Sequence, residues 1–110
     1  MIEYNDFLKV DIRVGTVIDA KPFPEARNPA LKLWIDFGED IGIKKTSAQI
    51  TQNYTPETII GLQVCAVVNF PSKQIGPFMS QCLTLGFEDA NGNITLIKPE
   101  KLSPNGSRLH

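Results

Sequence analysis

The residue types that most often carry enzyme chemistry are scarce in this sequence and poorly spaced. His110 is the single histidine and also the last residue, so no serine or cysteine nucleophile has a histidine base to activate it. Cys65 and Cys82 lie singly inside apolar runs, where a free cysteine behaves as a small hydrophobe. Metal sites need clustered Cys and His ligands. We therefore expect no enzyme, no metal and no cofactor.

The acidic residues and glycines give no stronger sign of chemistry. Asp36, Glu39 and Asp40 could form a carboxylate pair, but a solvated turn explains them better. The segment DANGN resembles a calcium loop, yet its glycine comes one position early and no glutamate closes it. No glycine-rich phosphate loop is present.

Several residues suit ligand binding instead, and each has a structural alternative. Lys32 and Trp34 share one face of an expected strand, a pairing of charge and stacking surface that single-stranded nucleic acid uses. Trp34 could equally pack in a subunit interface or under a loop. Lys44 and Lys45 precede a helix start predicted at Thr46, where backbone N–H groups favour an anion. The alternative for these two lysines is a solvated strand end.

The segment NFPSKQIGPFMSQ, residues 69–81, separates two apolar runs and is longer than a plain hairpin turn. Asn69, Lys73 and Ser80 offer polar contacts there, beside the large apolar Phe78 and Met79. A compact loop filled by its own side chains is the alternative. The length of the segment favours a functional loop.

Length and composition limit the class of protein. The 110 residues predict one domain, 1–110, with 42% hydrophobic and 21% charged residues, values typical of a globular protein. The net charge is −1 and the pI is near 5.7, so nucleic-acid binding would need a local basic patch. Neither a secretory signal nor a membrane-spanning apolar run is evident, which predicts a cytoplasmic protein without membrane insertion.

The hydrophobic periodicity is mainly that of strands. Residues 12–18 and 31–37 alternate apolar and other positions with period two, and Gly15 suggests a bulge or bend in the first of them. A proline-rich loop lies between. Residues 41–47, 63–70, 82–87 and 94–99 read as further strands, the last two joined by a two-residue turn at Asn91-Gly92.

Two short helices are expected between the third and fourth strands. Thr46 with Gln49 resembles a capping box for residues 46–54, and Thr55-Pro56 with Gly61 marks a second helix. Three strands, a helical insert, two strands and a terminal hairpin favour an all-β OB-fold, a five-stranded Greek-key barrel. An SH3-like barrel is the alternative, although it usually lacks the helix.

Three segments together resemble the tRNA-binding domain family: DIRVGTV, TSAQITQNYTPETIIG and VVNFPSKQIGPFMSQCLTLG. The segments PEARNPALKLWIDFG and IGIKKTSAQIT are similar to its CsaA subgroup of export-related chaperones. The resemblance implies an OB-fold homodimer whose terminal segments pack against the partner. It also implies a ligand surface around the helix start and the long loop, with Ser47, Asn69, Lys73 and Ser80.

The sequence departs from the family where tRNA-binding members usually carry consecutive basic residues. This chain has Ser72-Lys73 there, and Pro77-Phe78-Met79 before the serine. Fewer cations mean fewer phosphate contacts, while Phe78 and Met79 add adaptable apolar surface. The departures favour peptide over RNA.

The first hypothesis is a homodimeric, CsaA-like chaperone for unfolded or preprotein segments, with Phe78 and Met79 as contact area and Asn69, Lys73 and Ser80 as polar contacts. The alternative is a tRNA-binding protein that uses the same groove, with lysines on phosphates and an aromatic ring on a base. Its residues would be Lys32, Lys44, Lys45 and Lys73, with Trp34 or Phe78. An interaction scaffold that binds neither ligand is a third hypothesis.

Overall fold

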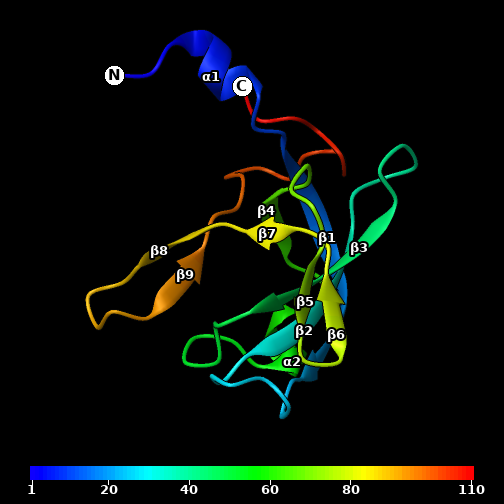
Figure 1. Ribbon diagram of the computed structural model, residues 1–110, viewed down its shortest axis with the longest axis vertical. Coiled ribbons are helices and arrows are strands. Elements are labelled where there is room, and N and C mark those ends of the chain that lie inside the picture. The colour runs from blue at the N-terminus through cyan, green and yellow to red at the C-terminus, as the bar shows by residue number, and fades with distance from the viewer.

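The computed structural model describes residues 1–110, and its centre is a nearly closed antiparallel barrel (Figure 1). The strand order in the main sheet is β3-β2-β1-β4-β7. Two separate hairpins, β5–β6 and β8–β9, complete the sheet structure. The elements in chain order are α1 (Tyr4–Leu8), β1 (Ile12–Pro22), β2 (Leu31–Asp36), β3 (Ile43–Ala48), α2 (Pro56–Ile59), β4 (Gln63–Val67), β5 (Lys73–Ile75), β6 (Phe78–Ser80), β7 (Leu83–Thr84), β8 (Gly86–Glu88) and β9 (Ile94–Leu96).

The barrel core follows the period-two pattern of the central strands. In β2, Leu31, Leu33 and Ile35 are buried, whereas Lys32 and Trp34 between them are only half-buried on the outer face. All residues of β4 are buried, as expected for a strand that is apolar on both faces. The segment after β6 closes the barrel against β3, because Gln81 N–H donates to the carbonyl of Lys45 at 2.8 Å. The predicted OB-fold is confirmed.

β1 is bent, but not as the sequence suggested. The β1–β2 register shifts between Val17 and Asp19, so the bulge lies there and leaves Ile18 exposed while Val17 enters the core. Gly15 instead allows a close approach: a Cβ at this position would lie 2.6 Å from Cγ2 of Ile35. The glycine is therefore explained by packing of β1 against the end of β2.

The helix predicted for residues 46–54 is wrong. β3 continues through Ala48, which is paired with Leu31, and Ser47 is paired with Lys32. The Thr46 hydroxyl does not cap a helix but lies buried inside the barrel. Because no helix begins there, Lys44, Lys45 and Ser47 are strand residues and not residues of an anion-binding helix start.

The second predicted helix is confirmed as α2. Thr55 precedes it as N-cap and accepts a hydrogen bond from Thr58 N–H, Pro56 is its first residue, and Gly61 follows in a left-handed conformation. Ile59 is fully buried in the barrel core. The helix thus contributes to the core between β3 and β4.

Three other features differ from the sequence reading. The expected loop 69–81 contains the β5–β6 hairpin, which turns at Gly76-Pro77. The segment 82–87 is divided into β7 and β8. The β8–β9 hairpin is present, but its loop has three residues, since Asp89 N–H donates to Asn93 O and Gly92 is left-handed.

An additional helix, α1, lies at the N-terminal end. Its start is stabilised by Asp6, which accepts a hydrogen bond from Glu3 N–H at 2.9 Å. None of its residues is buried, and it lies at the same end of the molecule as the C-terminus (Figure 1). Both helices are far too short to cross a bilayer, so the chain contains no membrane-spanning helix.

Candidate functional site

A groove of about 690 Å³ lies between the end of β3, the β5–β6 hairpin and the strands that follow it. It is lined by Ser47, Ala48, Gln49, Ile50, Phe70, Pro71, Lys73, Ile75, Ser80, Cys82, Leu83, Thr84, Gly86, Ile94 and Leu96. More than half of these residues are hydrophobic. A groove of this size with apolar walls and a few polar groups is typical of a ligand site.

The inner wall of the groove is held by buried hydroxyl groups. The Thr46 hydroxyl donates to the carbonyl of Cys82 at 2.7 Å, and it lies 3.1 Å from the hydroxyl of Ser80. Ser80 in turn accepts a hydrogen bond from Ser47 N–H at 3.3 Å. These contacts tie β6 to β3 and fix the position of Ser80, one of the residues expected in the site.

Cys82 lies in this wall, yet its thiol is unsuited to nucleophilic chemistry. Burial raises its pKa to about 11, although Lys44 and Thr46 act in the opposite direction. Burial also raises the pKa of Cys65. Since the thiolate is the reactive form, Cys82 is a structural residue at neutral pH. No cluster of His, Cys, Asp or Glu that could hold a metal ion is found.

Four expected residues, Lys32, Trp34, Lys45 and Phe78, lie outside the groove on β2, β3 and β6, together with Lys21 and Phe23 at the end of β1, which the sequence analysis did not single out. We call this group the lysine–aromatic face: Lys21, Phe23, Lys32, Trp34, Lys45 and Phe78. Phe78 is only 7% exposed, with its ring 5.4 Å from that of Phe23 and 6.0 Å from that of Trp34. The ammonium of Lys45 lies 5.0 Å from the Phe78 ring centroid.

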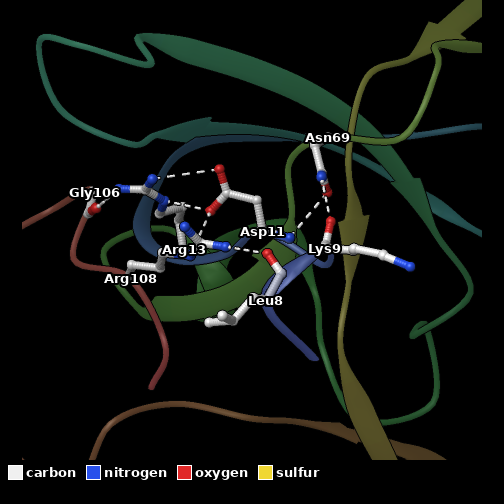
Figure 2. Close-up of polar contacts among 7 residues, drawn as sticks. All are labelled: Leu8, Lys9, Asp11, Arg13, Asn69, Gly106 and Arg108. Atoms are coloured by element: carbon white, nitrogen blue, oxygen red, sulfur yellow. Dashed lines mark hydrogen bonds and ion pairs between the residues drawn. The ribbon is translucent and has the colours of Figure 1, made fainter. Parts of the chain in front are cut away.

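Asn69 has a different position again, beside the N-terminal segment (Figure 2). Its side-chain amide donates to the carbonyl of Lys9 at 2.8 Å and accepts from Asp11 N–H at 3.0 Å. Asp11 also pairs with Arg13 at 2.6 Å and with Arg108 at 3.6 Å. Asn69 therefore connects the start of the β4–β5 segment to the N-terminal segment, where Asp11 in turn contacts Arg108 of the C-terminal segment.

The structure thus separates the expected site residues. It brings Ser47, Lys73 and Ser80 together at the groove, and it gathers Lys32, Trp34, Lys45 and Phe78 on the lysine–aromatic face. Lys44 is half-buried and close enough to Cys82 to influence its thiol, and Met79 is 37% exposed but does not line the groove.

Sequence reasoning missed much of the apolar lining, including Phe70, Ile75, Leu83 and Leu96. Phe70 and Leu83 are 53% and 49% exposed. The signal that could have found Phe70 and Leu83 is their place next to the segment's two boundaries, at the end of the apolar run 63–70 and the start of the run 82–87. Both had been predicted as strand residues, whereas Ile75 lies within the segment itself.

Residues 12–108 match the family described as "Putative tRNA binding domain". The chain is also similar to two solved chaperone CsaA structures. The one from Bacillus anthracis is 47% identical with a TM-score of 0.93, covering 100% of this chain and 99% of that one. The one from Picrophilus torridus has the same identity and TM-score and covers both chains completely.

A curated relative is a methionine–tRNA ligase from Porphyromonas gingivalis, 36% identical over 108 residues. The match covers 98% of this chain but only 15% of that enzyme, so the similarity concerns one domain of a much larger protein. The family match spans almost the whole barrel, including every strand that lines the groove. The chain therefore belongs to the tRNA-binding domain family.

Proposed function

We propose that this protein is a CsaA-like, non-enzymatic binding module that holds unfolded or preprotein segments in the groove. The observation that carries the proposal is the apolar lining of the groove, of which Phe70 and Leu83 remain about half exposed. Monomeric proteins rarely leave such residues together without a binding role. The similarity to two chaperone CsaA structures supports it.

The groove also offers the polar groups that an extended peptide needs. Ser47, Gln49 and Ser80 can form hydrogen bonds with a peptide backbone. The exposed Lys73 at the rim can form an ion pair with an acidic side chain or with the C-terminal carboxylate of a peptide. Phe78 and Met79 lie on β6 beside Ser80 but do not line the groove, so the apolar contact area comes from other residues. We further propose that the protein acts in the cytoplasm, in protein export, as a homodimer.

The test is a titration with a fluorescently labelled, permanently unfolded protein such as reduced and carboxymethylated α-lactalbumin. Burial of a phenylalanine or leucine side chain contributes about 1.5–3 kcal/mol. Phe70→Ser and Leu83→Ser should each weaken binding by roughly 10- to 100-fold. Ile43→Ser is the matched control, because Ile43 is 57% exposed and lies outside the groove. Unchanged affinity in both groove variants would refute the proposal.

A second candidate function is tRNA binding in the same groove, which the family match favours. Lys73 is the only cation in the lining, so this candidate makes Lys73 its main phosphate contact. Lys73→Glu should then abolish binding of bulk tRNA, and wild-type affinity should fall steeply with salt. Peptide binding to an apolar groove should depend only weakly on salt.

A further inference from the structure

The chain contains two Asn-Gly pairs, Asn91-Gly92 and Asn105-Gly106. Asparagine is a thermally labile residue. A following glycine increases this lability, because no Cβ shields the glycine nitrogen from the asparagine side chain. Since the two pairs consist of the same residues, a difference in their reactivity reports the structure around them.

The Asn105-Gly106 pair is held in place by the barrel. The side-chain oxygen of Asn105 accepts hydrogen bonds from the Thr16 hydroxyl at 2.8 Å and from the Gln63 side chain at 3.3 Å. The Gly106 N–H group donates to the carbonyl of Val14 at 2.8 Å. All of these hydrogen bonds have to break before the Gly106 nitrogen can reach Cγ of Asn105.

The Asn91-Gly92 pair is far less restricted. Both residues are exposed in the loop of the β8–β9 hairpin, and the side chain of Asn91 makes no hydrogen bond. A Cβ on Gly92 would meet no atom within 4 Å, so nothing packs against this side of the loop. The Gly92 nitrogen is restrained by its own hydrogen bond to the carbonyl of Asp89, at 3.0 Å. Opening an exposed hydrogen bond in a loop is a low-energy local fluctuation.

We propose that Asn91 is a modification site, at which spontaneous deamidation produces aspartate and isoaspartate. The Gly92 nitrogen attacks Cγ of Asn91, an N–Cγ bond forms, and the side-chain nitrogen leaves as ammonia together with the Gly92 proton. Water then opens the resulting succinimide. Hydrolysis of the new N–Cγ bond gives aspartate, whereas hydrolysis of the original peptide bond gives isoaspartate. The reaction consumes water and requires neither an oxidant nor a cofactor.

Isoaspartate at position 91 would alter the hairpin that forms one wall of the groove. It lengthens the main chain of the loop and adds a carboxylate close to that of Asp89, which already accepts hydrogen bonds from the Asn91 and Asn93 N–H groups. Like charges at this separation repel. Ile94 and Leu96 of the same hairpin line the groove. The modification therefore loosens this wall, and it does so irreversibly.

The experiment follows both Asn-Gly pairs in one sample by mass spectrometry. The protein is incubated folded and in concentrated urea, which gives the intrinsic rate of each pair. Trypsin cleavage after Lys73, Lys101 and Arg108 places the two pairs on different peptides. Relative to its intrinsic rate, Asn91 should deamidate roughly 10- to 100-fold faster than Asn105 in the folded protein, because Asn105 has two additional hydrogen bonds to break.

Two variants separate the sites. Asn91→Gln keeps the amide but lengthens the side chain, which disfavours ring closure, so position 91 should become stable while Asn105 is unaffected. Thr16→Val removes a hydrogen bond to Asn105 and should accelerate deamidation there roughly 3- to 10-fold, without a change at Asn91. In the isoaspartate fraction, the Asn93 amide should exchange with solvent faster than in fresh protein or in incubated Asn91→Gln.

Deamidation at Asn105 that equals or exceeds that at Asn91, each relative to its intrinsic rate, would overturn the proposed site. An Asn93 amide that exchanges as slowly in the isoaspartate fraction as in fresh protein would overturn the effect on the hairpin. Circular dichroism confirms that both variants are folded.

Discussion

At the scale of single residues, the groove depends on a side chain that no ligand would reach. Thr46 is 1% exposed and lies behind the groove, where its hydroxyl bonds to the Cys82 carbonyl and contacts the Ser80 hydroxyl. Together with the Ser47 N–H group, which donates to the Ser80 hydroxyl, Thr46 fixes the position of Ser80. The geometry of the exposed site is thus fixed from inside the barrel.

We expect Thr46→Val to reduce the free energy of unfolding by about 1–3 kcal/mol, since it keeps the shape but leaves the Cys82 carbonyl buried without its donor. Urea denaturation would measure the change. Thr95→Val is the control, because Thr95 is exposed and its hydroxyl makes no hydrogen bond. Equal effects of the two substitutions would contradict this role of Thr46.

At the scale of elements, the sequence predicted what packing and local chemistry determine together. The alternation in β2 located its core face, and Thr55-Pro56 located α2, because each signal agrees with the burial around it. The helix predicted from Thr46 was wrong because a capping signal is local. Continuation of β3 instead depends on pairing with β2, which is distant in sequence. The helix α1 was overlooked, although Asp6, three residues after Glu3, is a signal for it.

The β8–β9 hairpin gives a prediction about pH. The Asp89 carboxylate accepts hydrogen bonds from the Asn53 side chain and from the N–H groups of Asn93 and Asn91. These hold the pKa of Asp89 below its usual value of 3.8, with the Asn53 contact as the largest cause. A depressed pKa means that the stabilisation is complete above pH 3.8 and is lost as the pH falls through the folded value.

Amide hydrogen exchange by NMR would follow this loss. Protection of the Asn91 and Asn93 amides should be constant at neutral pH and decrease only in acid, below about pH 4. In Asp89→Asn the acid-dependent step should disappear. Retention of the step in that variant would assign it to a different carboxylate.

At the scale of the whole molecule, the site could be predicted only in part because its residues come from strands that are distant in sequence and adjacent in the barrel. Sequence reasoning gathered Lys73, Ser80 and Phe78 into one loop, and the hairpin does keep them on one side, since Lys73 is paired with Ser80 and Phe78 lies two residues before Ser80. They meet different neighbours along that side: Phe78, near the turn, packs against Trp34, while Ser80 bonds to Ser47. Which neighbours each residue meets depends on how the hairpin is placed against β3, and the sequence does not show this placement.

The two ends of the chain form one surface, held by the Asp11 network (Figure 2). Arg108 donates to the carbonyl of Leu8 at 2.7 Å and pairs with Asp11, and Leu109 N–H donates to Ile12 O. Apolar side chains remain uncovered there: Ile2, Tyr4, Leu8 and Leu109 are 79%, 71%, 44% and 46% exposed. Because the network fixes both segments, they can present a preformed apolar face to a second copy.

We therefore expect light scattering after size-exclusion chromatography to give twice the chain mass of 12.2 kDa. Leu8→Asp/Leu109→Asp should yield a monomer, because each carboxylate would be desolvated at the interface. Ile43→Asp adds charge at a more exposed position away from the termini and should leave the dimer intact. A monomeric wild-type protein would contradict the dimer. A dimer lost only in Ile43→Asp would contradict an interface at the chain termini. Arg108→Ala should weaken the dimer without touching its apolar residues, since it frees the C-terminal segment from the carbonyl of Leu8.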